Sequence, residues 1–242
     1  QCGFRAKRST TDMIFVARLL QEKCREQHRP LYTAFIDLTK AFDTIDRPIL
    51  WKILAKFGCP ATFLAIIRDF HEGMKARAIY GGGQSEFFPV QVGVKQGCVM
   101  APVIFKIFLS AVALFARHSF NVNDGVSLRY RLDGSLFNQQ RLRARTKTSL
   151  EHVFELQYAD DTALVSHSPD GLQNLLDATS DAYKKAGLVI NTRKTEVMQQ
   201  PLNRNEEPQA FFVNGTELAN VDQFTYLGSV LNNSHSLSDD VE

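Results

Sequence analysis

The sequence predicts an α+β fold, in which helices and antiparallel hairpins alternate along the whole chain. Apolar residues recur at helical spacing over Thr10–Lys23, and a short apolar run at Leu31–Leu38 is typical of a buried strand. Asp160-Asp161 joins two further strand-like segments. With 242 residues, the chain can form one large domain or two small ones, and it can bury a sizeable core.

The part of the chain before and after the first strand carries clear helix signals. Ser9 can cap a helix over Thr10–Lys23, because its hydroxyl can accept a hydrogen bond from the first turn. A second helix is expected to begin near Asp46 and to end at Gly58, a residue type that commonly stops helices. A third helix is expected after Pro60.

The remaining elements follow from turn residues and apolar runs. In order, we expect a hairpin over 76–92 around Gly81-Gly82-Gly83, an apolar helix opened by Pro102, an irregular basic segment over 121–150, strands at Val153–Ala159 and Thr162–Ser166, a helix from Pro169 to Gly187, a hairpin at Asn214-Gly215, and a last strand at Phe224–Val230.

The overall charge does not identify a nucleic-acid-binding protein, since the net charge is only +2. Basic residues are nevertheless concentrated between Arg129 and Lys147, where Asp133 is the single acid. Such a run can neutralise phosphates, although a solvated loop explains it equally well. The candidates for backbone contact are Arg141, Arg143, Arg145 and Lys147.

Cysteine spacing and hydropathy favour an intracellular protein, in the nucleus, the cytoplasm or both. The four cysteines are far apart and form no Cys-x-x-Cys pair, so a disulfide framework or a zinc site is not expected. The apolar run Val103–Phe115 is interrupted by Lys106 and Ser110 and is shorter than the ~20 residues that span a bilayer. Because the chain begins with Gln1, we expect a piece of a longer polypeptide.

Three carboxylates stand at unusual positions. Asp160 and Asp161 lie between strand-like segments, where aspartate is unfavourable, although a tight turn would also explain them. Asp37 ends an apolar run, where an uncompensated charge is costly. Either a cation such as Lys40 or Arg47, or a divalent ion, could compensate Asp37. Three carboxylates at a strand end and a hairpin tip can together hold two ions that clamp an in-line displacement at phosphorus.

Six segments carry a family resemblance. In order they are Gln1-Cys2-Gly3-Phe4-Arg5 with Ser9-Thr10, Phe35–Asp43 (FIDLTKAFD), Gly93–Cys98 (GVKQGC), Tyr158–Asp161 (YADD), Gly187–Glu196, and Tyr226-Leu227-Gly228. Each is weak alone, but together they resemble the reverse transcriptase of LINE-type, non-LTR retrotransposons. The sequence departs from that family at Val99-Met100-Ala101-Pro102, where Pro-Leu-Ser-Pro is usual.

The resemblance implies a polymerase palm, a ferredoxin-like antiparallel sheet with packed helices, plus part of the fingers. Residues 1–30 would be partial fingers and residues 31–242 the palm, with a basic insertion at about 121–150 and no thumb. Two Mg²⁺ ions, or Mn²⁺, would be the cofactors. The resemblance assigns their ligands to Asp37, Asp160, Asp161 and the carbonyl of Leu38.

The resemblance also assigns substrate contacts. Phe42, five residues after Asp37, matches the aromatic gate against a ribose 2′-hydroxyl. The other nucleotide contacts would be Gln96, Gly97 and Lys194, and the remaining nucleic-acid contacts Tyr158, Tyr226, Leu227 and Gly228. The partners would be an RNA template, a DNA primer and deoxynucleoside triphosphates, with an endonuclease and a thumb in the same polyprotein. An RNA-dependent RNA polymerase and a non-catalytic RNA-binding relic are the alternatives.

Overall fold

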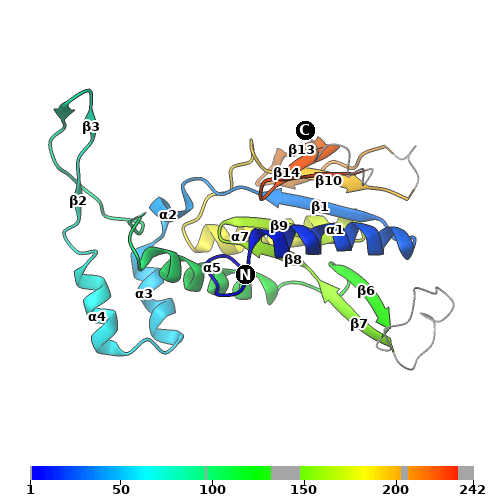
Figure 1. Ribbon diagram of the computed structural model, residues 1–242, viewed down its shortest axis with the longest axis horizontal. Coiled ribbons are helices and arrows are strands. Elements are labelled where there is room, and N and C mark those ends of the chain that lie inside the picture. Colours follow the sequence, from blue (N-terminus) through cyan, green and yellow to red (C-terminus); the bar gives the residue numbers. More distant parts are fainter. Residues whose placement is uncertain (1, 96, 132–147, 203–206, 234–242) are drawn as a thin grey trace.

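A five-stranded sheet forms the centre of the computed structural model, which describes residues 2–95, 97–131, 148–202 and 207–233 (Figure 1). Its strands lie in the order β13-β10-β1-β9-β8, and every neighbouring pair is antiparallel except the parallel pair of β10 and β13. The bounds are β1 Leu31–Ile36, β8 Glu155–Tyr158, β9 Asp161–Ser166, β10 Glu196–Gln200 and β13 Ala219–Val221. The α+β prediction is confirmed.

Both faces of this sheet are covered, and β1 is therefore buried along its whole length. Tyr32, Ala34 and Ile36 belong to the apolar core that includes α5 and α7. Leu31 and Phe35 belong to a second core, which includes α1. This alternation follows from the two-residue period of a strand. The covering helices are α1 Thr10–Glu26, α5 Ala101–Arg117 and α7 Pro169–Lys185.

The helix α1 begins where the sequence predicts, because Ser9 and Asp12 cap each other. The Ser9 N–H donates to the Asp12 carboxylate at 2.8 Å, and the Asp12 N–H donates to the Ser9 hydroxyl at 3.4 Å. This reciprocal arrangement satisfies two N–H groups that a helix start otherwise leaves without partners. The helix ends at Glu26, beyond the predicted Lys23.

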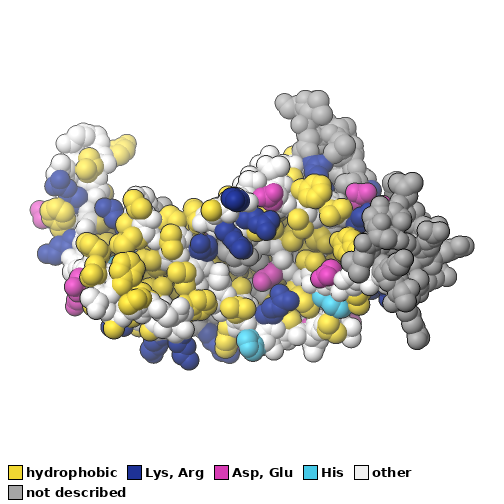
Figure 2. Space-filling view, turned by 60° about the horizontal axis from the view of Figure 1, so that its bottom comes forward, with side chains coloured by type: hydrophobic (Ala, Val, Ile, Leu, Met, Phe, Trp, Pro, Cys, Tyr) yellow, Lys and Arg dark blue, Asp and Glu magenta, His cyan; other side chains and the backbone are white. Residues whose placement is uncertain are grey.

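Three short helices and a projecting hairpin form one end of the molecule (Figure 1). The helices are α2 Ala41–Thr44, α3 Arg47–Lys56 and α4 Ala61–Asp69, and the hairpin is built from β2 Lys75–Ala76, β3 Ile79–Tyr80, β4 Gly83–Gln84 and β5 Phe88–Pro89. The predicted hairpin is confirmed, whereas α2 was not predicted. Figure 2 shows hydrophobic side chains gathered at this end, where Phe57, Phe63 and Phe70 are each more than half exposed.

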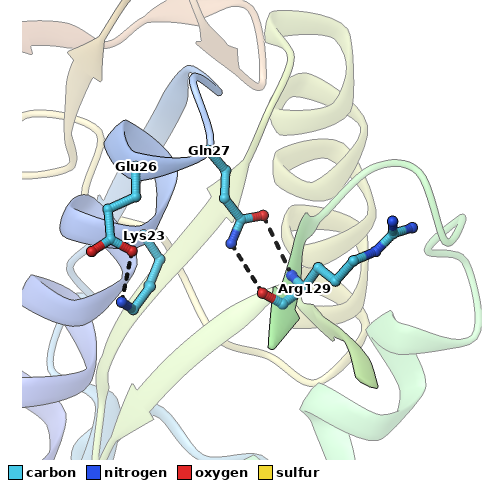
Figure 3. Close-up of polar contacts among 4 residues, drawn as sticks. All are labelled: Lys23, Glu26, Gln27 and Arg129. Carbon is cyan, nitrogen blue, oxygen red and sulfur yellow. Dashed lines mark hydrogen bonds and ion pairs between the residues drawn. The ribbon is translucent and has the colours of Figure 1, made fainter. Parts of the chain in front are cut away.

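The prediction of an irregular segment over 121–150 is wrong in part. β6 Val126–Arg131 pairs antiparallel with β7 Thr148–Val153. Val126 and Leu128 are fully buried between polar neighbours, so the two-residue period of a strand is present, and the basic side chains obscured it. The Gln27 side chain joins this hairpin to the end of α1: its amide donates to the Arg129 carbonyl at 3.2 Å and accepts from the Arg129 N–H at 3.4 Å (Figure 3).

The last predicted strand, Phe224–Val230, is instead a hairpin. β14 Gln223–Tyr226 pairs antiparallel with β15 Ser229–Asn232, and the chain reverses at Leu227-Gly228. Both turn residues have positive φ, 51° and 88° respectively, as a tight two-residue hairpin turn requires. The sequence does not predict this turn, because leucine rarely adopts a backbone conformation with positive φ. The hairpin predicted at Asn214-Gly215 is confirmed between β11 Phe212–Val213 and β12 Thr216–Glu217.

No helix in the described ranges is both long enough and apolar enough to cross a bilayer.

Candidate functional site

Strand register brings the three predicted carboxylates to one end of the sheet. β1 and β9 lie side by side (Figure 1), with Ile36 opposite Thr162. Asp37 follows Ile36 directly, and Asp161 precedes Thr162, so both stand at the same end of neighbouring strands. Asp160 lies in the turn that joins β8 to β9. Residues more than 120 positions apart in the sequence therefore share one end of the fold.

The backbone of Asp37 is fixed from the β10 side. Its N–H donates to the Thr195 hydroxyl at 3.3 Å, and its carbonyl accepts from the Asn191 N–H at 2.9 Å. Thr195 is fully buried. The Asn191 carbonyl also accepts from the Thr195 N–H at 2.9 Å, so one tight turn supplies both partners. The sequence analysis gave these two residues no role, although both lie in the segment Gly187–Glu196.

The Leu38 carbonyl faces the other way, toward the hairpin tip. Leu38 forms an antiparallel bridge with Ile190 in which the hydrogen bonds are made by the neighbouring residues. In such a pair, the N–H and C=O of the bridged residue point away from the partner strand. The carbonyl of Leu38 is thus directed to the β9 edge of β1, where Asp161 begins.

Charge accumulates at this end of the sheet. Partial burial, followed by the charges of Asp160 and Asp37, raises the pKa of Asp161 to about 6. Asp161 as a whole is exposed, so solvent screening weakens the repulsion between the carboxylates. In the described part of the chain, neither Lys40 nor Arg47 forms an ion pair with Asp37. The site therefore has an excess of negative charge that a cation would relieve.

The aspartates do not by themselves enclose an ion. Within the described ranges, no group of three or more His, Cys, Asp or Glu side chains is gathered closely enough to hold a metal. The donor chemistry still fits a hard divalent cation, because carboxylate and carbonyl oxygens are its preferred ligands. Oxygen ligands from elsewhere would have to complete the coordination.

Phe42 is held between two other aromatic rings. It stacks on the fully buried Phe105, with ring centroids 3.9 Å apart and planes 10° from parallel. The Phe4 ring approaches it edge-on at 6.4 Å. The Phe42 carbonyl also accepts from the Val94 N–H at 2.8 Å. Both the ring and the backbone of Phe42 are therefore tightly constrained.

The loop that begins at Gly93 is tied to the same region. The Gly93 N–H donates to the Ile45 carbonyl at 2.8 Å. The buried Arg47 guanidinium donates to four carbonyls, those of Gly93, His71, Val90 and Val92, at 2.8–3.3 Å. Burial lowers the pKa of Arg47, and these carbonyls replace the water that it loses. Farther along this loop, Gly97 has φ of 78°.

The turn after β14 approaches the carboxylates from the α1 side. Tyr226 is buried, its ring lies 5.6 Å from that of Phe35, and its hydroxyl has no hydrogen-bond partner in the described structure. Burial raises the pKa of Tyr226, and the charges of Asp161 and Cys2 raise it further. Tyr226 shares an apolar cluster with Tyr158, the residue that pairs with Asp161.

Other predicted contacts are less informative. Tyr158 is half-buried at the end of β8, where it pairs with Asp161, and Lys194 is exposed. Gln96 and the basic residues Arg141, Arg143, Arg145 and Lys147 lie outside the described residues. The structure therefore places the carboxylates and Leu38 at one end of the sheet, with Tyr158 paired to Asp161.

Comparison with known families decides what kind of domain this is. The sequence model of the family described as reverse transcriptase (RNA-dependent DNA polymerase) matches residues 1–231. The chain belongs to the reverse transcriptase family.

Relatives of this reverse transcriptase domain include retrotransposon polyproteins. A Pol polyprotein from the type-2 retrotransposable element R2DM of Drosophila melanogaster is 26% identical over 94% of the chain, which covers 20% of the relative. The RNA-directed DNA polymerase from mobile element jockey of Drosophila funebris is 25% identical over 97% of the chain, which covers 23% of that relative. These relatives confirm the LINE-type, non-LTR resemblance. The chain spans about a fifth to a quarter of their length.

Solved structures support the same fold. Apo telomerase from Candida tropicalis, truncated from its C-terminal domain, superposes with a TM-score of 0.57 and 13% identity over 92% of this chain and 38% of that one. Telomerase from Candida albicans, in complex with a TWJ fragment of telomeric RNA, superposes with a TM-score of 0.52 and 14% identity over 98% of this chain and 35% of that one. The reverse transcriptase domain thus has a polymerase palm and fingers fold.

Reverse transcriptases generally use divalent metal ions.

A second feature, away from the carboxylates, is a cleft of about 710 Å³ between α3, α4 and the β2–β5 hairpin. Its lining includes Arg47, Lys52, Arg68 and Lys75 against one acid, Glu72, together with Trp51 and His71. Because Arg47 is already occupied by carbonyls, the cations that can meet a ligand here are Lys52, Arg68 and Lys75, all of which are exposed.

Proposed function

We propose that this reverse transcriptase domain is the catalytic palm, with part of the fingers, of an RNA-directed DNA polymerase from a non-LTR retroelement. Its substrates are a DNA primer on an RNA template and deoxynucleoside triphosphates. The observation that carries the proposal is the strand register that sets Asp37 beside the Asp160-Asp161 turn. The relatives' length supports a parent polyprotein with further domains. From the family resemblance, we propose that an endonuclease and a thumb are among them.

The chain's own residues have distinct roles in this proposal. Asp37, Asp160 and Asp161, with the Leu38 carbonyl, would hold two Mg²⁺ ions, or Mn²⁺, at the end of β1 and β9. Bound there, the ions would lower the pKa of the attacking hydroxyl and stabilise the leaving oxygen. Gln96, Gly97 and Lys194 contact the nucleotide, and the Tyr226 turn positions the primer. The Phe42 ring, stacked on Phe105, leaves no room for a 2′-hydroxyl.

A primer-extension assay with the parent polypeptide tests the proposal. Extension of a DNA primer on an RNA template, with deoxynucleotides and Mg²⁺, is the expected result. Preference for ribonucleotides would indicate an RNA-dependent RNA polymerase instead. Tight RNA binding without extension under Mg²⁺ or Mn²⁺ would indicate a non-catalytic relic.

Replacement of Phe42 by alanine should relax sugar selection. The loss of the stacked ring opens space beside the sugar, so incorporation of ribonucleotides relative to deoxyribonucleotides should rise by about tenfold or more, equal to ~1.4 kcal/mol of discrimination. Competing single-nucleotide additions would measure the ratio. Phe63→Ala is a matched control, since Phe63 is an exposed phenylalanine on α4. An unchanged ratio for Phe42→Ala would place the gate elsewhere.

The cleft between α3 and α4 should bind single-stranded nucleic acid. Trp51 is the chain's single tryptophan, so an oligonucleotide in the cleft should quench its fluorescence. Combined alanine substitutions at Lys52, Arg68 and Lys75 should weaken binding and reduce the salt slope of log K by about 2, since single strands lose ~0.7 per phosphate contact. Lys184→Ala, on α7, should change neither quantity. An unchanged salt slope in the triple variant would show that nucleic acid does not bind in the cleft.

A further inference from the structure

The amino-terminal segment Cys2-Gly3-Phe4 contacts two parts of the candidate site. The Cys2 N–H donates to the Gln157 carbonyl at 2.8 Å, which attaches the segment to β8 just before the catalytic turn. The Phe4 ring lies nearly perpendicular to the Phe42 ring, with centroids 6.4 Å apart. Gly3, between these two anchors, lies directly on Ala159. These three successive residues therefore contact both the turn that precedes Asp160 and the Phe42 ring.

The contact of Gly3 with the turn leaves no space for a side chain. A Cβ atom built on Gly3 would lie 2.2 Å from the Ala159 nitrogen and 2.7 Å from its Cα. Real Cβ atoms do not approach backbone atoms this closely, so the backbone of Gly3 packs against the backbone of the turn. The glycine is required by this close approach and not by its own φ.

The turn that Gly3 covers is itself strained. Ala159 has φ of 52°, a conformation that non-glycine residues avoid and that persists only where the surrounding structure enforces it. Ala159 is followed immediately by Asp160 and Asp161. Any relaxation of Ala159 toward an ordinary backbone would rotate the following peptide and move both carboxylates. A rigid support on Ala159 thus fixes the direction of the metal ligands.

We propose that Cys2-Gly3-Phe4 is a positioning element, in which Gly3 holds the strained Ala159 turn for metal binding and Phe4 holds the Phe42 ring against Phe105. The proposal rests on the proposed polymerase function. It joins, in one segment, the placement of the metal ligands and the selection of the sugar. Gly3 and Phe4 touch neither the reacting atoms nor the metal in this scheme, and they act through Ala159 and Phe42.

The first arm of the test is Gly3→Ala in the parent polypeptide. We expect Mn²⁺ affinity, measured by electron paramagnetic resonance, to fall by about tenfold or more, and kcat for extension to fall with little change in KM for deoxynucleotides. Adding Ala159→Gly should restore part of the affinity, because it removes the strain that Gly3 maintains. Gly83→Ala is the control, since its φ is not positive and a Cβ there would meet only the Tyr80 carbonyl oxygen, at an ordinary 3.5 Å. Wild-type Mn²⁺ affinity in a folded Gly3→Ala variant would overturn the proposal.

The second arm is Phe4→Ala, which remains decisive if Gly3→Ala fails to fold. Phe4 is about half exposed, so its removal should leave the fold intact. Ribonucleotide incorporation should rise by a few fold while Mn²⁺ affinity stays at the wild-type value, and Phe4→Leu should restore only part of the selectivity. Unchanged sugar selectivity would overturn the role of Phe4. If the wild-type protein does not extend primers, the polymerase proposal fails, whereas the Mn²⁺ measurements still test Gly3.

Discussion

Replacement of Asp160 by asparagine should abolish primer extension while leaving the fold intact. The side chain keeps its size but loses the charge that a divalent ion requires, and we expect kcat to fall by at least about 1000-fold, or ~4 kcal/mol of barrier. The melting temperature should stay the same or rise, because Asp160 repels Asp161 in the folded chain. Extension assays and thermal unfolding would measure both. Asp69→Asn, an exposed aspartate at the end of α4, is the control.

The same variant should change how stability depends on pH. The folded pKa of Asp161 is raised to about 6, so ionised Asp161 disfavours the fold above that pH. This penalty disappears as pH falls from about 6 to the ordinary value near 4, where Asp161 is protonated in both states. Asp160→Asn should lower the pKa of Asp161 and flatten this dependence. Equal slopes in the two proteins, measured without metal, would contradict the repulsion between these carboxylates.

Mg²⁺ or Mn²⁺ should reverse the pH effect in the wild-type chain. An ion that binds only the folded site stabilises the protein by mass action, and it keeps Asp161 ionised. The melting temperature should therefore rise with metal concentration above pH 6, where the repulsion in the apo form is greatest. Asp160→Asn should lose most of this increase.

The positions of the three carboxylates at strand ends can be predicted from the sequence because they are local. Asp37 ends an apolar strand and Asp160-Asp161 forms a hairpin tip, and two antiparallel neighbours must then present these residues at one end. Once β1 and β9 are known to be neighbours, the position of each residue within its strand is enough to set the register. The long-range part, that these two strands are neighbours, came from the family resemblance and not from periodicity.

Contacts made through the backbone could not be predicted. Arg47 was a candidate partner for Asp37, yet its guanidinium donates to four carbonyls from the segment that follows α4. Gly3 was singled out only as part of a family segment, and nothing in the sequence connects it with Ala159, which lies far along the chain. A carbonyl or a glycine Cα gives no compositional signal for its distant partner. The contacts of such residues are known only once the strands are arranged in three dimensions.

A second glycine shows how strongly such a contact should affect stability. Gly93 has φ of 77°, and a Cβ there would lie 2.5–2.7 Å from the backbone of Asp43. This backbone follows Phe42, and the Gly93 N–H and carbonyl are bound to Ile45 and Arg47. The loop cannot withdraw from Asp43 without losing these hydrogen bonds. In a Gly93→Ala variant, the backbone strain at positive φ and the steric overlap with Asp43 would therefore both destabilise the fold.

Gly93→Ala should accordingly lower the free energy of unfolding by roughly 3–5 kcal/mol, from positive φ, steric overlap and weakened hydrogen bonds. Urea denaturation would measure it. Gly82→Ala is the matched control, because Gly82 has φ of 81° but its Cβ would meet nothing within 4 Å, so only the backbone strain of about 1 kcal/mol should remain. Equal losses in the two variants would show that the loop yields and that the contact with Asp43 does not hold it in place.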